Sequence, residues 1–407
     1  MTFRWVPSLP ARTWIVFGGE IVSAMGSGAT VPYLYVYLHV VCGMSVGLSV
    51  VMLNVQAMIW MGGAVLGGLA ADRAGAKTVA VVGLAAAGAG TWALALADTA
   101  VGGALAVAGY SLAYAMLTPA LDALVAEVVP AGQRQEVFGW RYGATNVGQA
   151  AGAGLAAVSL ASAAEGLPVL YLLDGVSFMV FALLIATCVR LAPSTHPARR
   201  VREGYRAVAT DPALRWICVM VVLVVAAGYA QLNVAVPAFV ITEGLDARCL
   251  GWVLAANTLA VMLFQVPAAR VTARHHRSRV LIGGVALMAG AWMLIQTAGR
   301  SGIPVLVVAV MLFGVGETLF APVVSSLVND LAPAALRGRY NAAQSLAWTG
   351  GFLVGTAAAG AALAAGGVHV LFAVLAGVMI LAVPAVTRLV TRMPEIQKTG
   401  GNIECRS

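Results

Sequence analysis

The sequence predicts an all-α polytopic membrane protein with twelve transmembrane helices, arranged as two six-helix bundles. Three observations lead to this prediction: the composition, a series of long apolar runs, and a sequence pattern that occurs twice. The 407-residue chain is 61% hydrophobic and only 10% charged, whereas soluble domains are roughly 45–50% apolar and roughly 25% charged. A water-soluble core cannot bury that much apolar surface, so lipid must cover much of it.

Twelve runs are apolar over the length that a transmembrane helix requires, which is about 20 residues. The first run is expected to remain in the mature chain, because it extends well beyond the apolar core of a cleaved signal peptide. The predicted runs are 13–38, 46–70, 78–97, 102–127, 136–161, 168–190, 214–241, 249–270, 279–298, 303–328, 338–364 and 368–391.

One pattern is written twice, half the chain length apart. The segment PALDALVAEVVPAGQR, 119–134, recurs in outline 203 positions later as PVVSSLVNDLAPAALR, 322–337. Six spans per half give both halves the same orientation, so we expect parallel repeats with a substrate path between them. The predicted domains are 1–190, a cytoplasmic linker 191–213, and 214–407 with a short cytoplasmic tail. The matched pairs are Pro119 and Pro322, Glu127 and Asp330, Pro130 and Pro333, Arg134 and Arg337, Gly148 and Gly351, and Gly152 and Gly355.

The repeated residues have local roles as well. Pro130 and Pro333 are expected to end a helix at the cytoplasmic surface, because proline donates no backbone hydrogen bond. Arg134 and Arg337 are expected to anchor the following helices among the lipid headgroups. The paired glycines, which lie one turn apart, are expected to let their two helices pack closely against neighbours.

The basic residues lie on one side of the predicted membrane. All 24 Lys and Arg residues except Arg248 and Arg300 fall in or beside the N-terminus, the even-to-odd loops or the C-terminal tail. This positive-inside asymmetry predicts that both termini are cytoplasmic. The net charge of +8 therefore does not indicate nucleic-acid binding, since no aromatic-rich recognition module accompanies the basic linker. Lysine is nearly absent, against 22 arginines, as is typical of a GC-rich bacterial genome, so we expect the bacterial inner membrane.

The five cysteines show no paired or metal-binding spacing. Cys42 and Cys249 both fall in predicted extracytoplasmic loops. A disulfide between them is one interpretation, and two unpaired apolar thiols are the other.

A motif between the second and third runs carries a family resemblance. The segment GLAADRAGAK, Gly68–Lys77, has the pattern Gly-x-x-x-Asp-Arg-x-Gly-x-Lys. In the first cytoplasmic hairpin of a twelve-span chain, this pattern resembles the signature of the major facilitator superfamily. With the repeat of six helices, the resemblance covers essentially the whole chain and implies the fold of that family. The motif departs from the family at Ala76, where a second basic residue is usual.

The resemblance implies a gate on the cytoplasmic side. Asp72 would cap the helix that begins near Arg337, which the helix dipole favours, and Arg73 would pair with Glu127. These contacts would hold the cytoplasmic side closed while the cavity opens outward. The alternative is a polar hairpin that only ends two helices, which would need Gly75 but not the charges. The implied gate residues are Gly68, Asp72, Arg73, Gly75, Lys77 and Glu127.

The fifth run, 136–161, carries a second motif. Its glycine spacing resembles the antiporter motif of the multidrug-efflux branch, whose members exchange drugs for protons. Two features depart from that branch: Ala153 stands where the motif continues with proline, and 102–126 lacks the arginine of many proton-coupled exporters. Arg141 would supply a buried cation instead. The motif residues are Gly139, Gly148 and Gly152.

Five ionisable residues lie inside predicted runs: Glu20, Asp122, Arg141, Asp174 and Glu317. Each costs about 2.5–3.5 kcal/mol at the bilayer centre, so such residues usually face a cavity or a partner. Desolvation favours the neutral carboxyl form, as proton exchange requires. Glu317, the deepest, is predicted first for proton or substrate binding, and Glu20 second. Asp122 and Arg141 are predicted to form an ion pair, with a transport role as the alternative. For Asp174 we expect a water-facing or structural role.

Neutral polar and aromatic side chains are predicted to line the cavity. Interhelical hydrogen bonding is an alternative explanation for each polar residue among them. The predicted lining residues are Tyr33, Asn54, Gln56, Gln231, Asn233, Asn257 and Gln344.

The predicted function is secondary active transport: export of hydrophobic or cationic drug-like molecules by proton antiport, through rocking of the two bundles. No Gly-x4-Gly-Lys-Ser/Thr loop occurs, so ATP is not expected to drive it. We expect no enzyme activity, cofactor or metal, with protons, a small-molecule substrate and the bilayer as partners of a monomer. One alternative is proton-coupled uptake or uniport of a metabolite such as a sugar or organic acid. The other is a receptor or assembly protein that does not transport.

Overall fold

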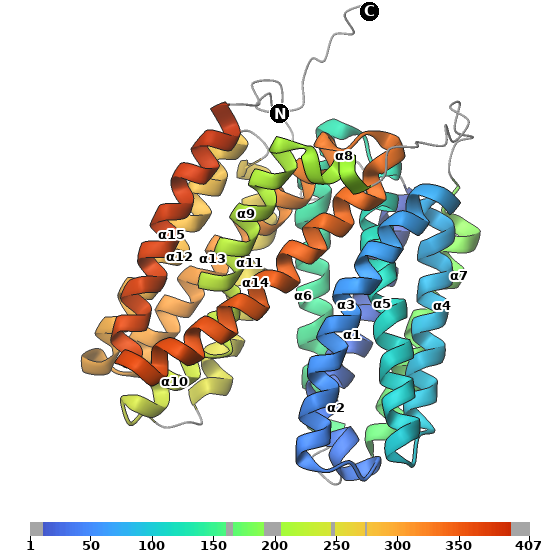
Figure 1. Ribbon diagram of the computed structural model, residues 1–407, viewed down its shortest axis with the longest axis horizontal. Coiled ribbons are helices and arrows are strands. Elements are labelled where there is room, and N and C mark those ends of the chain that lie inside the picture. Colours follow the sequence, from blue (N-terminus) through green and yellow to red (C-terminus); the bar gives the residue numbers. More distant parts are fainter. Residues whose placement is uncertain (1–10, 160–165, 191–204, 246–248, 273–274, 392–407) are drawn as a thin grey trace, which may run out of the picture. The chain divides into compact units, whose positions relative to one another are not determined.

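A computed structural model describes residues 11–159, 166–190, 205–245, 249–272 and 275–391 (Figure 1). All regular secondary structure within these ranges is helical. The predicted all-α class is therefore confirmed.

Ten helices among the described residues are long and apolar enough to cross a membrane, and Val368–Ala382 forms a shorter apolar helix. The predicted run 136–161 corresponds to α6 (Arg134–Ser159). It is not one of the ten, because polar residues such as Arg141 and Asn146 lower its mean hydropathy. The protein thus has the architecture of a multi-pass membrane protein.

The chain forms two compact units. Helix α6 contributes its beginning to the second unit and its end to the first. The predicted linker 191–213 includes a short helix, α8 (Tyr205–Thr210), while its residues 191–204 lie outside the described part. The division of the chain at this linker stays a prediction. The units are Met1–Pro130 with Val147–Arg200, and Ala131–Asn146 with Val201–Ser407.

The first unit is built from long helices with local stop signals. Ser45 accepts a hydrogen bond from the backbone N–H of Leu48 at the start of α3, and Thr99 accepts one from Gly102 at the start of α5, as N-cap residues do. Helix α5 ends at Val128, just before Pro130, as predicted. The helices are α1 (Ala11–Thr30), α2 (Leu34–Val36), α3 (Val46–Ala74), α4 (Ala76–Ala95), α5 (Ala100–Val128) and α7 (Leu167–Cys188) (Figure 1).

The second unit has a large aromatic core, in which Trp292, Phe313 and Phe372 are fully buried. Helix α13 ends at Leu331, before Pro333, which matches the prediction from the repeat. Besides the first part of α6, its helices are α9 (Pro212–Ala227), α10 (Ala235–Thr242), α11 (Cys249–Thr272), α12 (Arg277–Ser301), α13 (Ile303–Leu331), α14 (Arg337–Gly366) and α15 (Val368–Thr391) (Figure 1).

The predicted seventh run is not one continuous helix. A 3-10 turn, Tyr229–Leu232, separates α9 from α10. Helix ends leave backbone carbonyls without intrahelical partners, and two side chains satisfy them here. Gln231 Nε2 donates to the carbonyl of Ala226 at 2.6 Å, and Trp292 Nε1 donates to that of Ala227 at 2.7 Å. Side chains thus stabilise the break in this helix.

The paired glycines allow equivalent close contacts in the two units. Gly148 and Gly152 lie so close to α1 that a Cβ on either would overlap atoms of that helix. Gly351 and Gly355 lie equally close to α9. The close packing predicted for the repeated glycines is therefore confirmed.

Candidate functional site

The carboxyl group of Glu317 lies inside the second unit. Glu317 is at the middle of α13 and only 4% exposed. The hydroxyl of Tyr142, on the first part of α6, donates to Glu317 Oε2 at 3.2 Å. The amide of Asn257 on α11 and the phenol of Tyr229 also lie near this carboxyl group. Helices that are far apart in the sequence therefore converge on Glu317.

The surroundings of Glu317 are aromatic and uncharged. The ring of Tyr229 lies 4.8 Å from that of Trp348 and 5.8 Å from that of Phe313, both edge to face. In the described part of the chain, no lysine, arginine or histidine forms an ion pair with Glu317. An ionised carboxylate there would need a cation to offset its desolvation. The site can therefore hold a proton or a positively charged group.

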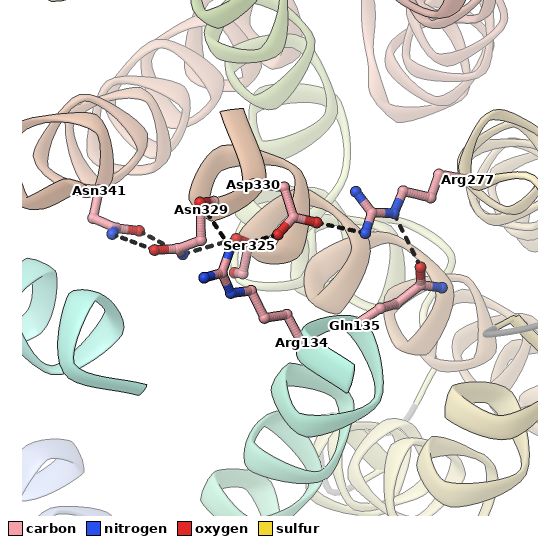
Figure 2. A network of polar contacts seen from close by, with 7 residues as sticks. All are labelled: Arg134, Gln135, Arg277, Ser325, Asn329, Asp330 and Asn341. Carbon is pink, nitrogen blue, oxygen red and sulfur yellow. Dashed lines mark hydrogen bonds and ion pairs between the residues drawn. The ribbon is translucent and has the colours of Figure 1, made fainter. Parts of the chain in front are cut away.

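A second polar cluster surrounds Asp330 at the end of α13 (Figure 2). Arg134 Nη1 donates to Asp330 Oδ1 at 2.7 Å, and Arg277 Nη2 donates to Oδ2 at 2.6 Å. Arg277 Nε also donates to Gln135 Oε1 at 3.3 Å. One carboxylate thus joins the first turns of α6 and α12 to the last turn of α13, all within the second unit.

The Asp330 cluster corrects one expectation. Arg134 was predicted to anchor α6 among lipid headgroups, but its side chain is only 12% exposed and pairs with Asp330. A nearby carboxylate stabilises the guanidinium by charge-assisted hydrogen bonds, which solvated headgroups cannot match in a partly buried position.

The same end of α13 is tied to α14 by amides (Figure 2). Asn329 and Asn341 exchange hydrogen bonds through their side chains, at 3.0 and 2.9 Å. Gln344 Nε2 donates to Ser325 Oγ at 3.1 Å. Gln344, a predicted lining residue, is buried in a contact between two helices.

The motif between α3 and α4 forms a tight connection. Gly75 has φ +90°, a conformation that glycine adopts without a Cβ clash, and no residue separates it from the two helices. Lys77 Nζ donates to the carbonyl of Ala186 at 2.9 Å, in the last turn of α7, where a cation also complements the helix dipole. The motif thus ties α4 to the end of α7.

The remaining gate residues are placed as follows. Gly68 is buried, Asp72 is half-buried, and Arg73 and Glu127 are exposed. The cap of Asp72 on the helix that begins near Arg337, and the pairing of Arg73 with Glu127, stay predictions.

The other predicted ionisable residues lie in different surroundings. Glu20 is half-buried on α1. Asp122 belongs to the first unit and Arg141 to the second, so their ion pair stays a prediction. The guanidinium of Arg141 lies 5.9 Å from the ring centroid of Phe138. Asp174, which was expected to face water or to serve a structural role, is completely buried on α7.

Gly139, the first glycine of the fifth-run motif, packs within the second unit. A Cβ on Gly139 would meet the Cβ of Ala269 and the amide of Gln265, both on α11. Gln265 is 1% exposed, and its amide atoms have no hydrogen-bond partner among the described residues. Helices α6 and α11 are therefore in close contact at this glycine.

The predicted lining residues have varied surroundings. Gln231 is buried and donates to carbonyls at the end of α9 and on α14, so interhelical bonding accounts for it. Asn233 is exposed, while Tyr33, Gln56 and Asn257 are half-buried. Asn257 Nδ2 also donates to the carbonyl of Val310 at 3.4 Å. The side chain of Asn54 lies outside the described part.

Sequence reasoning missed two partnerships. Tyr142, which donates to Glu317, was not among the residues predicted to line the cavity. Arg277 was assigned no partner from the sequence, but it pairs with Asp330, the repeat counterpart of Glu127. The retained acid at the 203 offset is the signal that would have found this pair.

Comparison with known proteins gives consistent matches over the whole chain. The family model described as Major Facilitator Superfamily matches residues 16–248 and 244–403. An uncharacterized MFS-type transporter of Bacillus subtilis, YqjV, is 25% identical over 394 residues, which cover 91% of this chain and 92% of YqjV.

Two solved structures share the fold. A bacterial homologue of the iron transporter ferroportin, in its outward-facing state, superposes with a TM-score of 0.80 at 16% identity and covers 94% of this chain and 100% of that one. The proton:xylose symporter XylE superposes with a TM-score of 0.74 at 15% identity, with 93% and 95% covered.

Proposed function

This chain belongs to the major facilitator superfamily, and on that premise we propose that it exports hydrophobic or cationic small molecules in exchange for protons. The family assignment makes it a multi-pass transporter and not an enzyme. The exchange with protons, the export direction and the drug-like substrate are parts of the proposal.

The observation that supports proton exchange is the isolation of Glu317. Its carboxyl group is buried, accepts a hydrogen bond from Tyr142, and forms no ion pair with a cationic side chain of the described residues. Such a group is stable when it holds a proton or when a cationic substrate offsets its charge. The two states exclude one another at a single carboxyl group, and this competition is the basis of exchange.

The driving force comes from the proton gradient. One proton that crosses about 100 mV contributes about 2.3 kcal/mol, and the pH difference adds to it. A proton that binds Glu317 from outside displaces a cationic substrate, and its release to the cytoplasm leaves the site ready for the next one. Alternating access of the two predicted bundles would expose the site to each side in turn.

The cytoplasmic gate belongs to the same proposal. Asp72, Arg73 and Glu127 would close the inner side, and Lys77 supports the motif through α7. We further propose a monomer in the bacterial inner membrane with both termini in the cytoplasm, which the positive-inside distribution of arginine supports.

Proton-coupled uptake of a metabolite is the alternative function. Ala153 in place of the motif proline, and the lack of a basic residue in 102–126, both favour it. The fold is compatible with this function, since XylE is a proton:xylose symporter.

The test is transport in liposomes with an imposed pH gradient, over a panel of cationic dyes, drugs and sugars. We expect the wild type to move cationic compounds against their gradient, and Glu317→Gln to lose this accumulation, because the amide can neither release a proton nor offset a cationic charge. Glu20→Gln measures whether Glu20, the second predicted acid, also contributes to this accumulation. Glu243→Gln, an acid outside the membrane spans that pairs with His369, is the matched control.

The proposal fails if Glu317→Gln accumulates substrate at the wild-type rate. Sugar uptake along with protons, with no movement of cationic compounds, would support the alternative function instead.

A further inference from the structure

The first transmembrane helix breaks next to a buried carboxyl group. Helix α1 ends at Thr30, and a 3-10 turn, Val31–Tyr33, follows. Pro32 explains the break, because proline cannot donate a backbone hydrogen bond to the preceding turn. The N–H of Leu34 donates to the carbonyl of Val31. The carbonyl of Thr30 instead accepts a hydrogen bond from the hydroxyl of Tyr171, on α7, at 3.2 Å.

Asp174 lies one turn further along α7 and contacts the same end of α1. It is 0% exposed, and its Oδ2 lies 2.8 Å from Thr30 Oγ1. Gly26 makes room for it, because a Cβ at that position would overlap the Asp174 carboxyl group. The end of α1 and this acid therefore pack in direct contact.

If Asp174 were ionised, the neighbouring hydroxyl groups would have fewer hydrogens than there are acceptor oxygens within hydrogen-bond distance. Thr30 has a single hydroxyl hydrogen, yet its Oγ1 lies 3.2 Å from the carbonyl oxygen of Gly26 and 3.4 Å from that of Ser27, as well as 2.8 Å from Asp174 Oδ2. Ser177 Oγ donates to the backbone carbonyl of Asp174 at 2.7 Å, and lies 3.4 Å from Asp174 Oδ1.

A protonated carboxyl group resolves this count. Asp174 then donates its own hydrogen to Thr30 Oγ1, and Thr30 donates to the carbonyl of Gly26 in the preceding turn. Every short contact then has one hydrogen, and no charge is buried. An ionised Asp174 would require the hydrogen of Thr30. The next donor, the Ser177 hydroxyl, lies 3.4 Å from Asp174 Oδ1 and already donates to the backbone carbonyl of Asp174.

The groups that face Asp174 from neighbouring helices are neutral. Tyr110 on α5 and Tyr171 on α7 interact with it, and Tyr37 packs on Tyr171 with ring centroids 4.6 Å apart. The thiol of Cys42 interacts with Tyr171. No lysine, arginine or histidine of the described residues forms an ion pair with Asp174.

We propose that Asp174 is a second proton-binding site, and that its proton fastens the outer end of the first transmembrane helix to α7. Loss of this proton to water would take the Thr30 hydrogen from the carbonyl of Gly26 and place an unpaired charge against α1. The segment 31–41, which consists of short 3-10, α and π turns, would then loosen. The inference does not depend on the exported substrate or on Glu317.

Infrared spectroscopy tests the proton directly. In an E317Q background, so that Glu317 contributes nothing, the protein at neutral pH should show the carbonyl band of a protonated carboxylic acid. Asp174→Asn in that background should remove the band, and Thr30→Val should shift it to higher frequency, because its hydrogen bond is lost. Ser177→Ala should leave its frequency nearly unchanged. Identical carboxylic-acid spectra of the background and the Asp174→Asn variant would overturn the proposal.

Thiol labelling tests the loosening. Cys42 is buried at the end of the segment 31–41, and its Sγ donates to the carbonyl of Ala97 at 3.6 Å. With the other cysteines replaced, the wild type and Asp174→Asn should label equally at acidic pH. At alkaline pH the wild type should label several-fold faster than the neutral variant. Comparison of the two at each pH cancels the ordinary effect of pH on the thiol.

Equal labelling of both proteins at every pH would contradict the proposed release. Slower labelling in sodium than in potassium at one pH would also overturn it, because the site would then bind a metal cation in place of a proton. Transport by Glu317 variants is measured in a separate assay. Failure of the Asp174 proposal therefore leaves the proposed transport function untouched, and failure of that function leaves the Asp174 proposal untouched.

Discussion

The two buried carboxyl groups differ in the chemistry of their partners. Glu317 accepts a hydrogen bond from the phenol of Tyr142, a donor that can stabilise an ionised carboxylate. Asp174 faces Thr30, whose hydroxyl also lies near two backbone carbonyls. Glu317 thus has a phenol as its hydrogen-bond donor, whereas the single hydroxyl hydrogen of Thr30 is shared between Asp174 and backbone carbonyls.

The Tyr142 hydroxyl should matter for exchange. Tyr142→Phe removes the donor from Glu317, and a hydrogen bond to a charged group contributes about 1.5–3 kcal/mol. We expect gradient-driven transport to fall by roughly tenfold or more, since about 1.4 kcal/mol corresponds to a factor of ten. Tyr340→Phe is the matched control, because its hydroxyl donates to Asp211, the N-cap of α9. Equal losses in the two variants would argue against a specific role for Tyr142.

The Asp330 cluster should contribute measurably to stability. Asp330→Asn leaves Arg134 and Arg277 without their partly buried carboxylate, so we expect a loss of about 1.5–3 kcal/mol in unfolding free energy. The measurement is thermal unfolding in detergent. His369→Gln breaks an exposed pair with Glu243, and exposed pairs contribute less than about 1 kcal/mol. If both variants unfold at the same temperature, the cluster does not stabilise the unit.

Cys42 should be an unreactive thiol at neutral pH. Burial raises the pKa of the Cys42 thiol above its usual value, and the charge of Asp98 raises it further. Only the thiolate reacts with alkylating reagents, so a raised pKa lowers the reactive fraction until the pH rises through it. We expect Cys42 to label much more slowly than the exposed Cys188 at pH 7, as measured by mass spectrometry of single-cysteine variants.

At the scale of elements, each unit contains a helix that ends at a 3-10 turn, α1 in the first and α9 in the second, and side chains satisfy the free backbone groups there. Tyr171 does so at the end of α1, and Gln231 and Trp292 do so at the end of α9. Helices that are interrupted inside a membrane need such partners, because lipid offers none.

The glycine contacts between helices are also testable at this scale. Gly152→Ala and Gly355→Ala insert a methyl group against backbone atoms of α1 and α9, and overpacking costs about 1–3 kcal/mol. Gly154 and Gly350 have open space around the position of a Cβ, so their replacement by alanine should cost little. Thermal unfolding of all four variants gives the comparison. A cost at Gly154 or Gly350 equal to that at Gly152 would refute the packing argument.

At the scale of the molecule, the two compact units do not coincide fully with the two halves of the sequence repeat. The 203 offset pairs α5 with α13 and α6 with α14, and the ends of α5 and α13 follow it. Helix α6, however, contributes its first part to the second unit and its remainder to the first. The partners of Glu317 and Asp330 therefore include residues from the N-terminal half of the chain.

The sequence by itself determined the class of protein. Composition, apolar runs and the Gly68–Lys77 motif are properties of local segments, so they predicted a multi-pass helical protein and its superfamily without knowledge of any contact. The depth of Glu317 followed in the same way from its position in an apolar run. The helix break at Gly228 was not predicted, because it depends in part on Trp292 from the distant helix α12.

Only the tertiary structure decided which polar groups meet. A carboxyl group has no sequence signal for its partner when that partner is far away in the chain, as Tyr142 is from Glu317 and Thr30 is from Asp174. Arg134 was assigned to the lipid headgroups from its position alone, and the fold placed it against Asp330 instead. Local patterns specify helices and their burial, whereas the pairing of polar groups is fixed by the packing of helices, in which each buried polar group needs a partner.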